Sequence, residues 1–203
     1  MKLYFHPMSS SSRRAYATAL HLGIPFERQL IDLVSPTERA QLVQLNPNSK
    51  IPVLVDGDFV LWESHAIMRY LCTKAPNQTL YPTDPRMRAE VDRWLDWSGA
   101  HLGPSVGPIG FERMWKKLVT GGEPDLDVIA RHERLFHQFA TVLDQQLAER
   151  EWLTGRSLSL ADYSVAAVLM YRDRCQLPIG GYSHLLRYLD RFATVPAWTQ
   201  SEC

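Results

Sequence analysis

The sequence predicts a mixed α/β domain over residues 1–75 and an all-helical domain over residues 86–203. Short apolar runs alternate with helical segments in the first 75 residues. Their β-α-β-α-β-β-α order implies a mixed four-stranded sheet with helices packed on it. After Arg86 the apolar residues recur with helical spacing and no strand is indicated. Residues 76–85 between the two regions are polar and proline-rich, which is typical of a linker.

Four short runs in the first region predict strands, at residues 2–5, 26–31, 52–55 and 59–62. The last two flank Asp56-Gly57-Asp58, and an Asp-Gly pair between apolar runs is a strong signal for a β-hairpin. Helices are expected over residues 13–22 and after residue 63, where Ile67 and Leu71 share a face.

The remaining helix of this region carries its own start and stop signals. Ser35 is a candidate N-cap, Pro36 suits the first helical position, and Glu38 stands three residues after the serine. The helix is expected to end before Asn46-Pro47, because a residue that precedes proline avoids the α conformation.

The second region shows helical periodicity throughout. On one predicted helix, a single face contains Met87, Val91, Trp94, Leu95 and Ser98. On a second, longer helix, a single face contains Ile129, Phe136, Phe139, Leu143 and Leu147. Two more helices are expected over residues 160–171 and 182–192. The Gly- and Pro-rich stretch 103–110 is expected to break or bend the packing. Ser159 and Asp162 have the spacing of a capping box, so we assign both to structure.

The composition excludes several classes of protein. Lys plus Arg and Asp plus Glu both number 22, and a formal net charge of zero gives no electrostatic case for nucleic acid or an anionic membrane. No apolar run is long enough for a membrane span, and the N-terminus turns polar too early for a signal peptide. Three scattered cysteines indicate neither a disulfide framework nor a zinc site. We therefore expect a cytoplasmic protein with no nucleic-acid partner, no membrane contact and no metal.

Several common catalytic motifs are missing from the sequence. It contains no G-x-S-x-G, no P-loop and no G-x-G-x-x-G. His132 and His137 sit on a predicted helix, but a spacing of five residues turns the second about 140° away from the first. One metal ion could not bind both.

The most informative segment runs from Phe5 to Arg14, which leaves a strand, crosses a short loop and enters a helix. Thioredoxin-like folds place a sulfur site at such a junction, because helix N-terminal amides and the helix dipole stabilise an anion. Four serines, Ser9 to Ser12, stand here and no cysteine does. A thiolate would therefore have to arrive with a ligand. The alternative is that the serines only cap the helix.

Two other stretches resemble the glutathione transferase superfamily. Residues 45–54 are similar to its pattern N-P-x-G-K-[VI]-P-[VI]-L, and residues 62–71 to E-S-x-A-I-x-x-Y-L. Ser159 and Asp162 match the capping box of its second domain. The resemblance covers nearly the whole chain and implies a thioredoxin-like glutathione-binding domain before the helical one. Ser49 departs from the family pattern, which has glycine there.

The resemblance assigns roles in glutathione binding to five residues. Pro52 resembles the family's cis-proline, which leaves the backbone of Ile51 open to pair with the cysteinyl part of glutathione. Glu63 would pair with the γ-glutamyl ammonium, and Ser64 would take the α-carboxylate together with helix amides. Lys50 would reach the glycyl carboxylate. Simple helix capping is the alternative for Glu63 and Ser64, and a solvated surface lysine is the alternative for Lys50.

The chemistry that the resemblance implies is attack of glutathione, as co-substrate, on a small hydrophobic electrophile. A serine hydroxyl would donate a hydrogen bond to the thiolate and lower its pKa. Ser9 is the expected donor, since the family's catalytic serine stands four residues before the helix arginine, and Ser11 is the second candidate. An electrophile pocket is expected between the domains. Its candidate lining residues are Met8, Trp97, His101, Phe111 and Trp115, with ordinary core packing as the alternative for each.

The family resemblance further implies a homodimer, with Arg69, Tyr70 and the helix over residues 86–97 in the contact surface. Two other functions stay open. One is a glutathione-dependent isomerase of the zeta type, because the serine run partly resembles its S-S-C-S-x-R pattern. The other is a non-catalytic relative that serves as a protein-interaction module.

Overall fold

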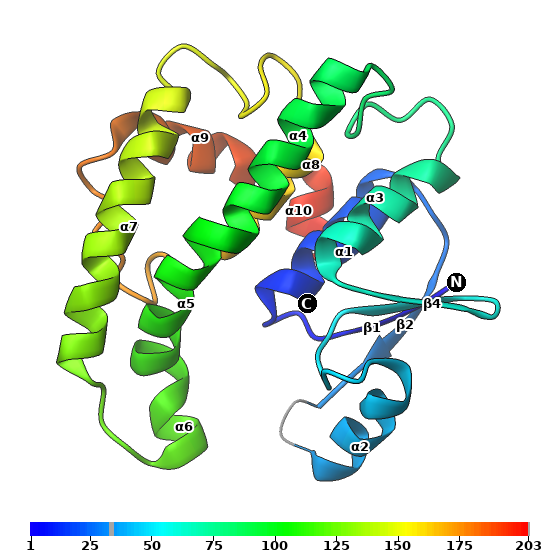
Figure 1. Ribbon diagram of the computed structural model, residues 1–203, viewed down its shortest axis with the longest axis horizontal. Helices are drawn as coiled ribbons and strands as arrows, with labels where there is room; N and C mark the ends of the chain where they lie inside the picture. Colours follow the sequence, from blue (N-terminus) through cyan, green and yellow to red (C-terminus); the bar gives the residue numbers. More distant parts are fainter. Residues whose placement is uncertain (33–34, 203) are drawn as a thin grey trace. The chain divides into compact units, whose positions relative to one another are not determined.

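The computed structural model describes residues 1–32 and 35–202 (Figure 1). The chain forms two compact units: unit 1 holds Met1–Pro82 and the C-terminal segment from Thr194 onward, and unit 2 holds Thr83–Ala193. The sequence-based division placed all of residues 86–203 in the helical domain. The difference arises because the last helix, α10 (Pro196–Gln200), packs against α1 (Ser10–His21) of unit 1.

Unit 1 contains the expected mixed four-stranded sheet, in the order β2-β1-β3-β4. Its strands are β1 (Lys2–Phe5), β2 (Glu27–Leu30), β3 (Val53–Asp56) and β4 (Phe59–Trp62). β1 pairs parallel with β2 and antiparallel with β3, and β3 pairs antiparallel with β4. Asp56 pairs with Phe59, so the two turn residues are Gly57 and Asp58. Gly57 has φ +65°, a conformation that glycine adopts without steric cost.

The two faces of the sheet differ in how tightly they are covered. Leu3 and Phe5 point to one face, where α1 and α3 (Ser64–Lys74) bury an apolar cluster that includes Ile67 and Leu71. The opposite face is covered by α2 (Pro36–Leu45), of which only Leu42 is buried among its described residues (Figure 1). The core of unit 1 therefore lies on the α1–α3 side.

The helix starts of unit 1 follow their capping residues. α1 begins at Ser10, three residues earlier than expected, because Ser9 is the N-cap and its side chain accepts a hydrogen bond from the Ser12 amide. Ser35 caps α2 as expected and accepts from the Glu38 amide at 3.3 Å. α2 ends at Leu45, directly before Asn46-Pro47.

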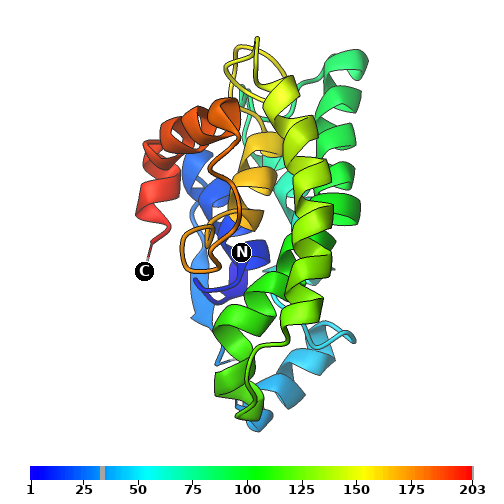
Figure 2. The same cartoon turned by 90° about the vertical axis from the view of Figure 1, so that its left-hand side faces the viewer.

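Unit 2 is helical. Its helices are α4 (Pro85–Trp97), η1 (Ser98–Leu102), α5 (Gly103–Gly110), η2 (Phe111–Trp115), α6 (Lys116–Thr120), α7 (Leu126–Gln146), α8 (Leu160–Val168) and α9 (Ser183–Ala193). The long helix α7 runs alongside α5 (Figure 2). Most of the apolar face residues are buried as expected, but Met87 is 59% exposed. No helix in the part of the chain that is described is long and apolar enough to cross a membrane.

The Gly- and Pro-rich stretch was expected to break or bend the packing, and it does not break the helical run. It forms α5 itself, between two π-helical turns in which an amide bonds to the carbonyl five residues back. The Gly103 amide donates to the Ser98 carbonyl, and the Lys116 amide donates to the Phe111 carbonyl. A proline lacks the amide donor and its ring crowds the carbonyl four residues back. The wider turn of η1, which directly precedes Pro104, takes up this mismatch there, and Pro108 lies inside α5.

Candidate functional site

The serine loop connects β1 to α1 and presents hydroxyls at a helix N-terminus. A turn closes it, in which the Ser9 amide donates to the His6 carbonyl at 3.0 Å. Ser9 Oγ then accepts from the Ser12 amide at 3.2 Å. Its hydroxyl proton has no acceptor in residues 1–32 and 35–202, so it is available to a ligand.

The other three serines lie in the first turn of α1. Ser10 and Ser11 are half-buried, and their amides precede the first backbone bonds of the helix. Ser12 is fully buried, and its Oγ finds no hydrogen-bond partner in the described chain. Since Ser12 Oγ is shut off from solvent, it is less accessible than the hydroxyl of Ser9.

The backbone before β3 forms a second polar edge. The Ile51–Pro52 peptide bond is cis, as the resemblance implied. β3 begins at Val53, which pairs with Tyr4. The amide and carbonyl of Ile51 have no hydrogen-bond partner among the described residues, so both can pair with an extended ligand backbone.

Asn46 organises the loop that leads to this edge. It is buried, and its Nδ2 donates to the Lys50 carbonyl at 2.7 Å while its Oδ1 accepts from the backbone and side chain of Asn48. Ser49 has φ +52°, the left-handed conformation that the family's glycine would adopt without strain. The Lys50 side chain is exposed.

A third polar edge lies at the start of α3. Glu63 is the N-cap with φ +71°, and its exposed side chain makes no cap hydrogen bond. A positive φ at a non-glycine residue is uncommon and is concentrated at functional sites. Neither Glu63 nor Ser64 has a side-chain partner within the described ranges. The N-terminus of α3 therefore has a carboxylate beside it that makes no cap hydrogen bond.

The five candidates for the electrophile pocket lie in both units. Met8 is in the serine loop of unit 1 and is 40% exposed. Trp97 and His101 pack in unit 2 around Phe139, with ring-centroid distances of 5.8 Å and 5.4 Å. Phe111 and Trp115 are the first and last residues of η2.

Comparison with known proteins establishes the family. Residues 8–74 match the model of the glutathione S-transferase N-terminal domain, and residues 127–191 match that of its C-terminal domain. Glutathione S-transferase F10 of Arabidopsis thaliana is 31% identical across 97% of this chain and 94% of its own length. Glutathione S-transferase theta-1 of Homo sapiens is 32% identical across 98% and 81%. The chain belongs to the glutathione S-transferase family.

Solved structures of glutathione transferases have the same fold. Glutathione transferase F2 from Populus trichocarpa superposes with a TM-score of 0.89 at 26% identity, covering 98% of this chain and 96% of that one. The theta class glutathione S-transferase from Xanthomonas axonopodis pv. citri, solved with glutathione bound, gives a TM-score of 0.84 at 26% identity. It covers 98% of this chain and 95% of its own. The relatives are transferases, and the chain is a glutathione transferase enzyme.

Ser159 and Asp162 form the capping box of α8 in the transferase fold. The Asp162 carboxylate is fully buried and accepts hydrogen bonds from the Leu153 amide at 2.9 Å and the Ser159 amide at 2.8 Å. It also accepts from the Ser159 hydroxyl at 2.9 Å. Burial nevertheless raises the pKa of Asp162 to about 6. All of these contacts are internal, so the pair serves structure.

Two features of the transferase were not found by sequence reasoning. One is a contact between Arg14 Nη1 and His65 Nε2 at 2.6 Å, which joins the first turns of α1 and α3. Burial and the charges of Arg14 and Arg69 lower the pKa of His65 to about 3, so its ring is neutral at physiological pH. The other is the set of contacts that Arg13 makes with Trp198, Ser201 and Glu202. Two arginines at a helix N-terminus, where a cation opposes the dipole, were the available signal.

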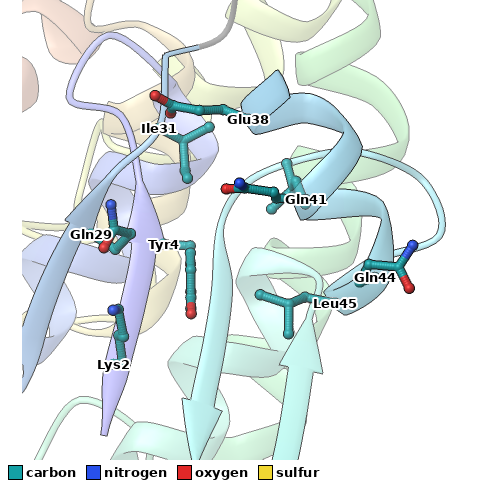
Figure 3. A pocket seen from close by; sticks show the side chains of 9 residues that line it. Lys2, Tyr4, Gln29, Ile31, Glu38, Gln41, Gln44 and Leu45 are labelled. Atoms are coloured by element: carbon teal, nitrogen blue, oxygen red, sulfur yellow. The ribbon is translucent and has the colours of Figure 1, made fainter. Parts of the chain in front are cut away.

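A groove of about 430 Å³ lies between β1, β2 and α2, on the loosely covered face of the sheet (Figure 3). Side chains such as Tyr4 and Gln29 from the sheet and Gln41 from α2 line it. None of the predicted glutathione-binding residues is among its described lining. Residues 1–32 and 35–202 also contain no cluster of His, Cys, Asp and Glu side chains suited to a metal ion.

Proposed function

We propose that unit 1 binds glutathione across its three polar edges and that Ser9 activates the glutathione thiol for attack on a small hydrophobic electrophile. The observation that carries the proposal is shared by these edges. The Ser9 hydroxyl proton, the Ile51 backbone and the Glu63 and Ser64 side chains are all without protein partners in the described chain. Polar groups left without protein partners at a helix start or a strand edge are suited to a polar ligand.

The start of α3 and the loop before β3 would take the peptide parts of glutathione, and the serine loop would take its thiol. The γ-glutamyl ammonium would pair with Glu63, and its carboxylate would accept from Ser64 and the first amides of α3. The cysteinyl backbone would pair with Ile51 like one more strand. The glycyl carboxylate would lie near Lys50. That the theta class relative was crystallised with glutathione bound supports glutathione as the ligand.

In the proposed mechanism Ser9 is a hydrogen-bond donor and never a covalent nucleophile. A free thiol has a pKa of about 8.5, so only a few per cent is ionised at neutral pH. The Ser9 hydroxyl and the amides at the start of α1 stabilise the thiolate, and the thiol proton leaves to solvent. The sulfur lone pair then forms a bond to the electrophilic carbon. The electron pair displaced there leaves with the departing group or moves into the acceptor's π system.

Ser9 is preferred over the other serines because its Oγ already accepts from the Ser12 amide. This bond fixes the oxygen and leaves the proton to point outward. Ser11 is the second candidate, since it is half-buried in the first turn of α1. Ser12 Oγ is buried, so its hydroxyl is the least accessible of these.

The proposal extends to the partners of the chain. We place the electrophile against Met8, Trp97, His101, Phe111 and Trp115, and we propose a cytoplasmic homodimer. Exposed apolar side chains support self-association: Phe59 is 45% exposed, Trp62 is 37% exposed and Met87 is 59% exposed. Light scattering at micromolar concentration is expected to give the mass of two chains, and a mass of one chain would contradict the dimer.

Calorimetry with reduced glutathione tests binding, and a serine-by-serine alanine series tests the mechanism. Saturable binding at micromolar to millimolar ligand is expected. Ser9→Ala is expected to raise the apparent pKa of bound glutathione and to slow reaction with a generic electrophile at least about tenfold, since a hydrogen bond to a charged group is worth ~1.5–3 kcal/mol. Ser10→Ala is the matched control. No heat at millimolar glutathione would overturn the proposal, and an unaffected Ser9→Ala beside an inactive Ser11→Ala would move the role to Ser11.

A further inference from the structure

The C-terminal segment of the chain, residues 196–202, is held by a side chain of the serine loop's own helix. Arg13 Nε donates to Ser201 Oγ at 3.0 Å, and Arg13 Nη2 donates to the Trp198 carbonyl at 3.2 Å and to Glu202 Oε1 at 2.8 Å. The guanidinium carbon also lies 3.7 Å from the centroid of the Trp198 ring. The segment thus accepts hydrogen bonds from Nε and Nη2 of the guanidinium and packs the Trp198 ring against its planar face.

All of these contacts except the ion pair with the exposed Glu202 are enclosed. The Arg13 side chain is only 11% exposed, and Ser201 is fully buried. The Ser201 hydroxyl donates to the Trp198 carbonyl at 2.6 Å while it accepts from Arg13. Each group in the contact therefore has a defined donor or acceptor role. Such an arrangement holds a side chain in one position far better than a single exposed ion pair does.

Arg13 is tied to Ser9 through the backbone of the first turn of α1. The Arg13 amide donates to the Ser9 carbonyl at 2.8 Å, and the Ser12 amide donates to Ser9 Oγ. A displacement of the Arg13 side chain would therefore also move Ser9, whose hydroxyl is the proposed hydrogen-bond donor. The two arginines, Arg13 and Arg14, oppose the dipole of α1, which has no acidic residue in its first turn. The cation at position 13 is stabilised by the C-terminal segment instead.

We propose that the C-terminal segment is part of the thiol-activating machinery, with Arg13 as a positioning residue that fixes the first turn of α1 and with it the Ser9 hydroxyl. The inference rests on the proposed function of Ser9. It assigns the segment no contact with glutathione. A displacement of a catalytic group by about 1 Å can cost on the order of a hundredfold in rate, so a firm anchor beside Ser9 has a direct kinetic consequence.

The test compares Arg13→Lys, Trp198→Leu and Ser201→Ala with the parent enzyme. Lysine keeps the charge but loses the fork and the planar face. All three variants are expected to lower kcat roughly fivefold or more and to raise the apparent pKa of bound glutathione by about half a unit or more. Their affinity for S-methylglutathione, which has the peptide contacts but no ionisable thiol, is expected to stay within about twofold of the parent. Arg28→Lys is the matched control, because Arg28 donates to the Tyr16 hydroxyl in the same unit and makes no contact with the C-terminal segment within the described ranges.

Amide hydrogen exchange supplies a readout that does not depend on glutathione chemistry. Ser10 to Arg13 are expected to exchange faster in the Arg13 and Trp198 variants, with little change in the Arg28 variant. Variants that melt at a lower temperature but keep the parent pKa, kcat and exchange rates would overturn the inference. If the parent binds no glutathione, the proposed function fails by itself, and the exchange measurement still decides whether the segment holds the first turn of α1.

Discussion

Two helices in this chain, α8 and α3, begin with similar residues that are used in different ways. α8 begins with Ser159 and Asp162, whose polar atoms bond to one another and to nearby amides in a fully buried setting. α3 begins with Glu63 and Ser64, whose side chains have no partner within the described ranges. A helix start that satisfies its own donors stabilises the fold, and one that leaves them open is ready for a ligand.

Backbone conformation sharpens the contrast. Ser159 has the extended conformation of an ordinary N-cap, with φ −138° and ψ 174°. Glu63 has φ +71° and makes no cap bond that would compensate for it. A positive φ that no cap hydrogen bond accompanies is consistent with the binding role that we propose for Glu63.

The largest expected effect is a fall in the free energy of unfolding when the buried capping box of α8 is removed. Asp162→Ala would leave the Leu153 amide, the Ser159 amide and the Ser159 hydroxyl buried without an acceptor. Each orphaned donor costs about 1–3 kcal/mol, so the free energy of unfolding is expected to fall by about 3–5 kcal/mol in denaturant titrations. Asp125→Ala removes the exposed N-cap of α7 and is expected to cost only ~1 kcal/mol. Equal losses in the two variants would contradict the assignment.

The next effect is a pH dependence with opposite sign at the two helix starts. The pKa of His65, in the first turn of α3, is lowered to about 3 by burial and two arginines. Below about pH 6.5 His65 is therefore protonated in the unfolded chain but not in the folded chain, so the free energy of unfolding falls on acidification. At pH 5 this contribution reaches ~2 kcal/mol. The pKa of Asp162 is raised to about 6, so its contribution is present at low pH and is lost as the pH rises through 6.

Because the two contributions partly cancel in the parent protein, single variants must separate them. The stability of His65→Gln relative to the parent is expected to improve by about 2 kcal/mol between pH 7 and pH 5. Asp162→Asn relative to the parent is expected to shift the other way, by ~1 kcal/mol. Denaturant titrations at both pH values measure the differences. Shifts of the same sign would show that the two groups do not titrate as described.

Removal of the Glu63 carboxylate at the start of α3 is expected to affect binding rather than folding. Glu63→Ala removes an exposed carboxylate with no internal partner, so calorimetry is expected to show glutathione affinity reduced at least about tenfold, or ~1.4 kcal/mol. The free energy of unfolding is expected to change by less than about 0.5 kcal/mol. A large stability loss with unchanged affinity would assign Glu63 to structure, like Asp162.

Features that follow from local sequence were predictable, and those that depend on distant contacts were not. Ser35, Pro36 and the Asp-Gly hairpin were found because capping and turn chemistry act within a few residues. The contact of Arg13 with Ser201 spans 188 residues and leaves no periodic trace in the sequence. The π-helical turns beside α5 also escaped prediction, because a proline signals a break locally while the surrounding helix absorbs it. Family motifs located Glu63, whereas the structure alone showed that its side chain has no cap bond.

The smallest expected effect concerns Ser49, the one position where the glutathione-binding motif departs from its family pattern. Ser49 has φ +52°, which costs a residue with a Cβ about 1–2 kcal/mol, and glycine avoids that cost. Glycine also has more freedom in the unfolded chain, and Ser49 Oγ donates to the Arg39 carbonyl at 3.3 Å, so part of the gain is offset. Ser49→Gly is therefore expected to stabilise the protein by about 0.5 kcal/mol, seen as a rise in the midpoint of thermal unfolding. Ser49→Ala keeps the strain and loses the hydrogen bond, and it is expected to be less stable than the parent. If the glycine variant were also less stable, the Arg39 contact would outweigh the backbone strain, and the serine would be holding the loop that carries Lys50 and Ile51.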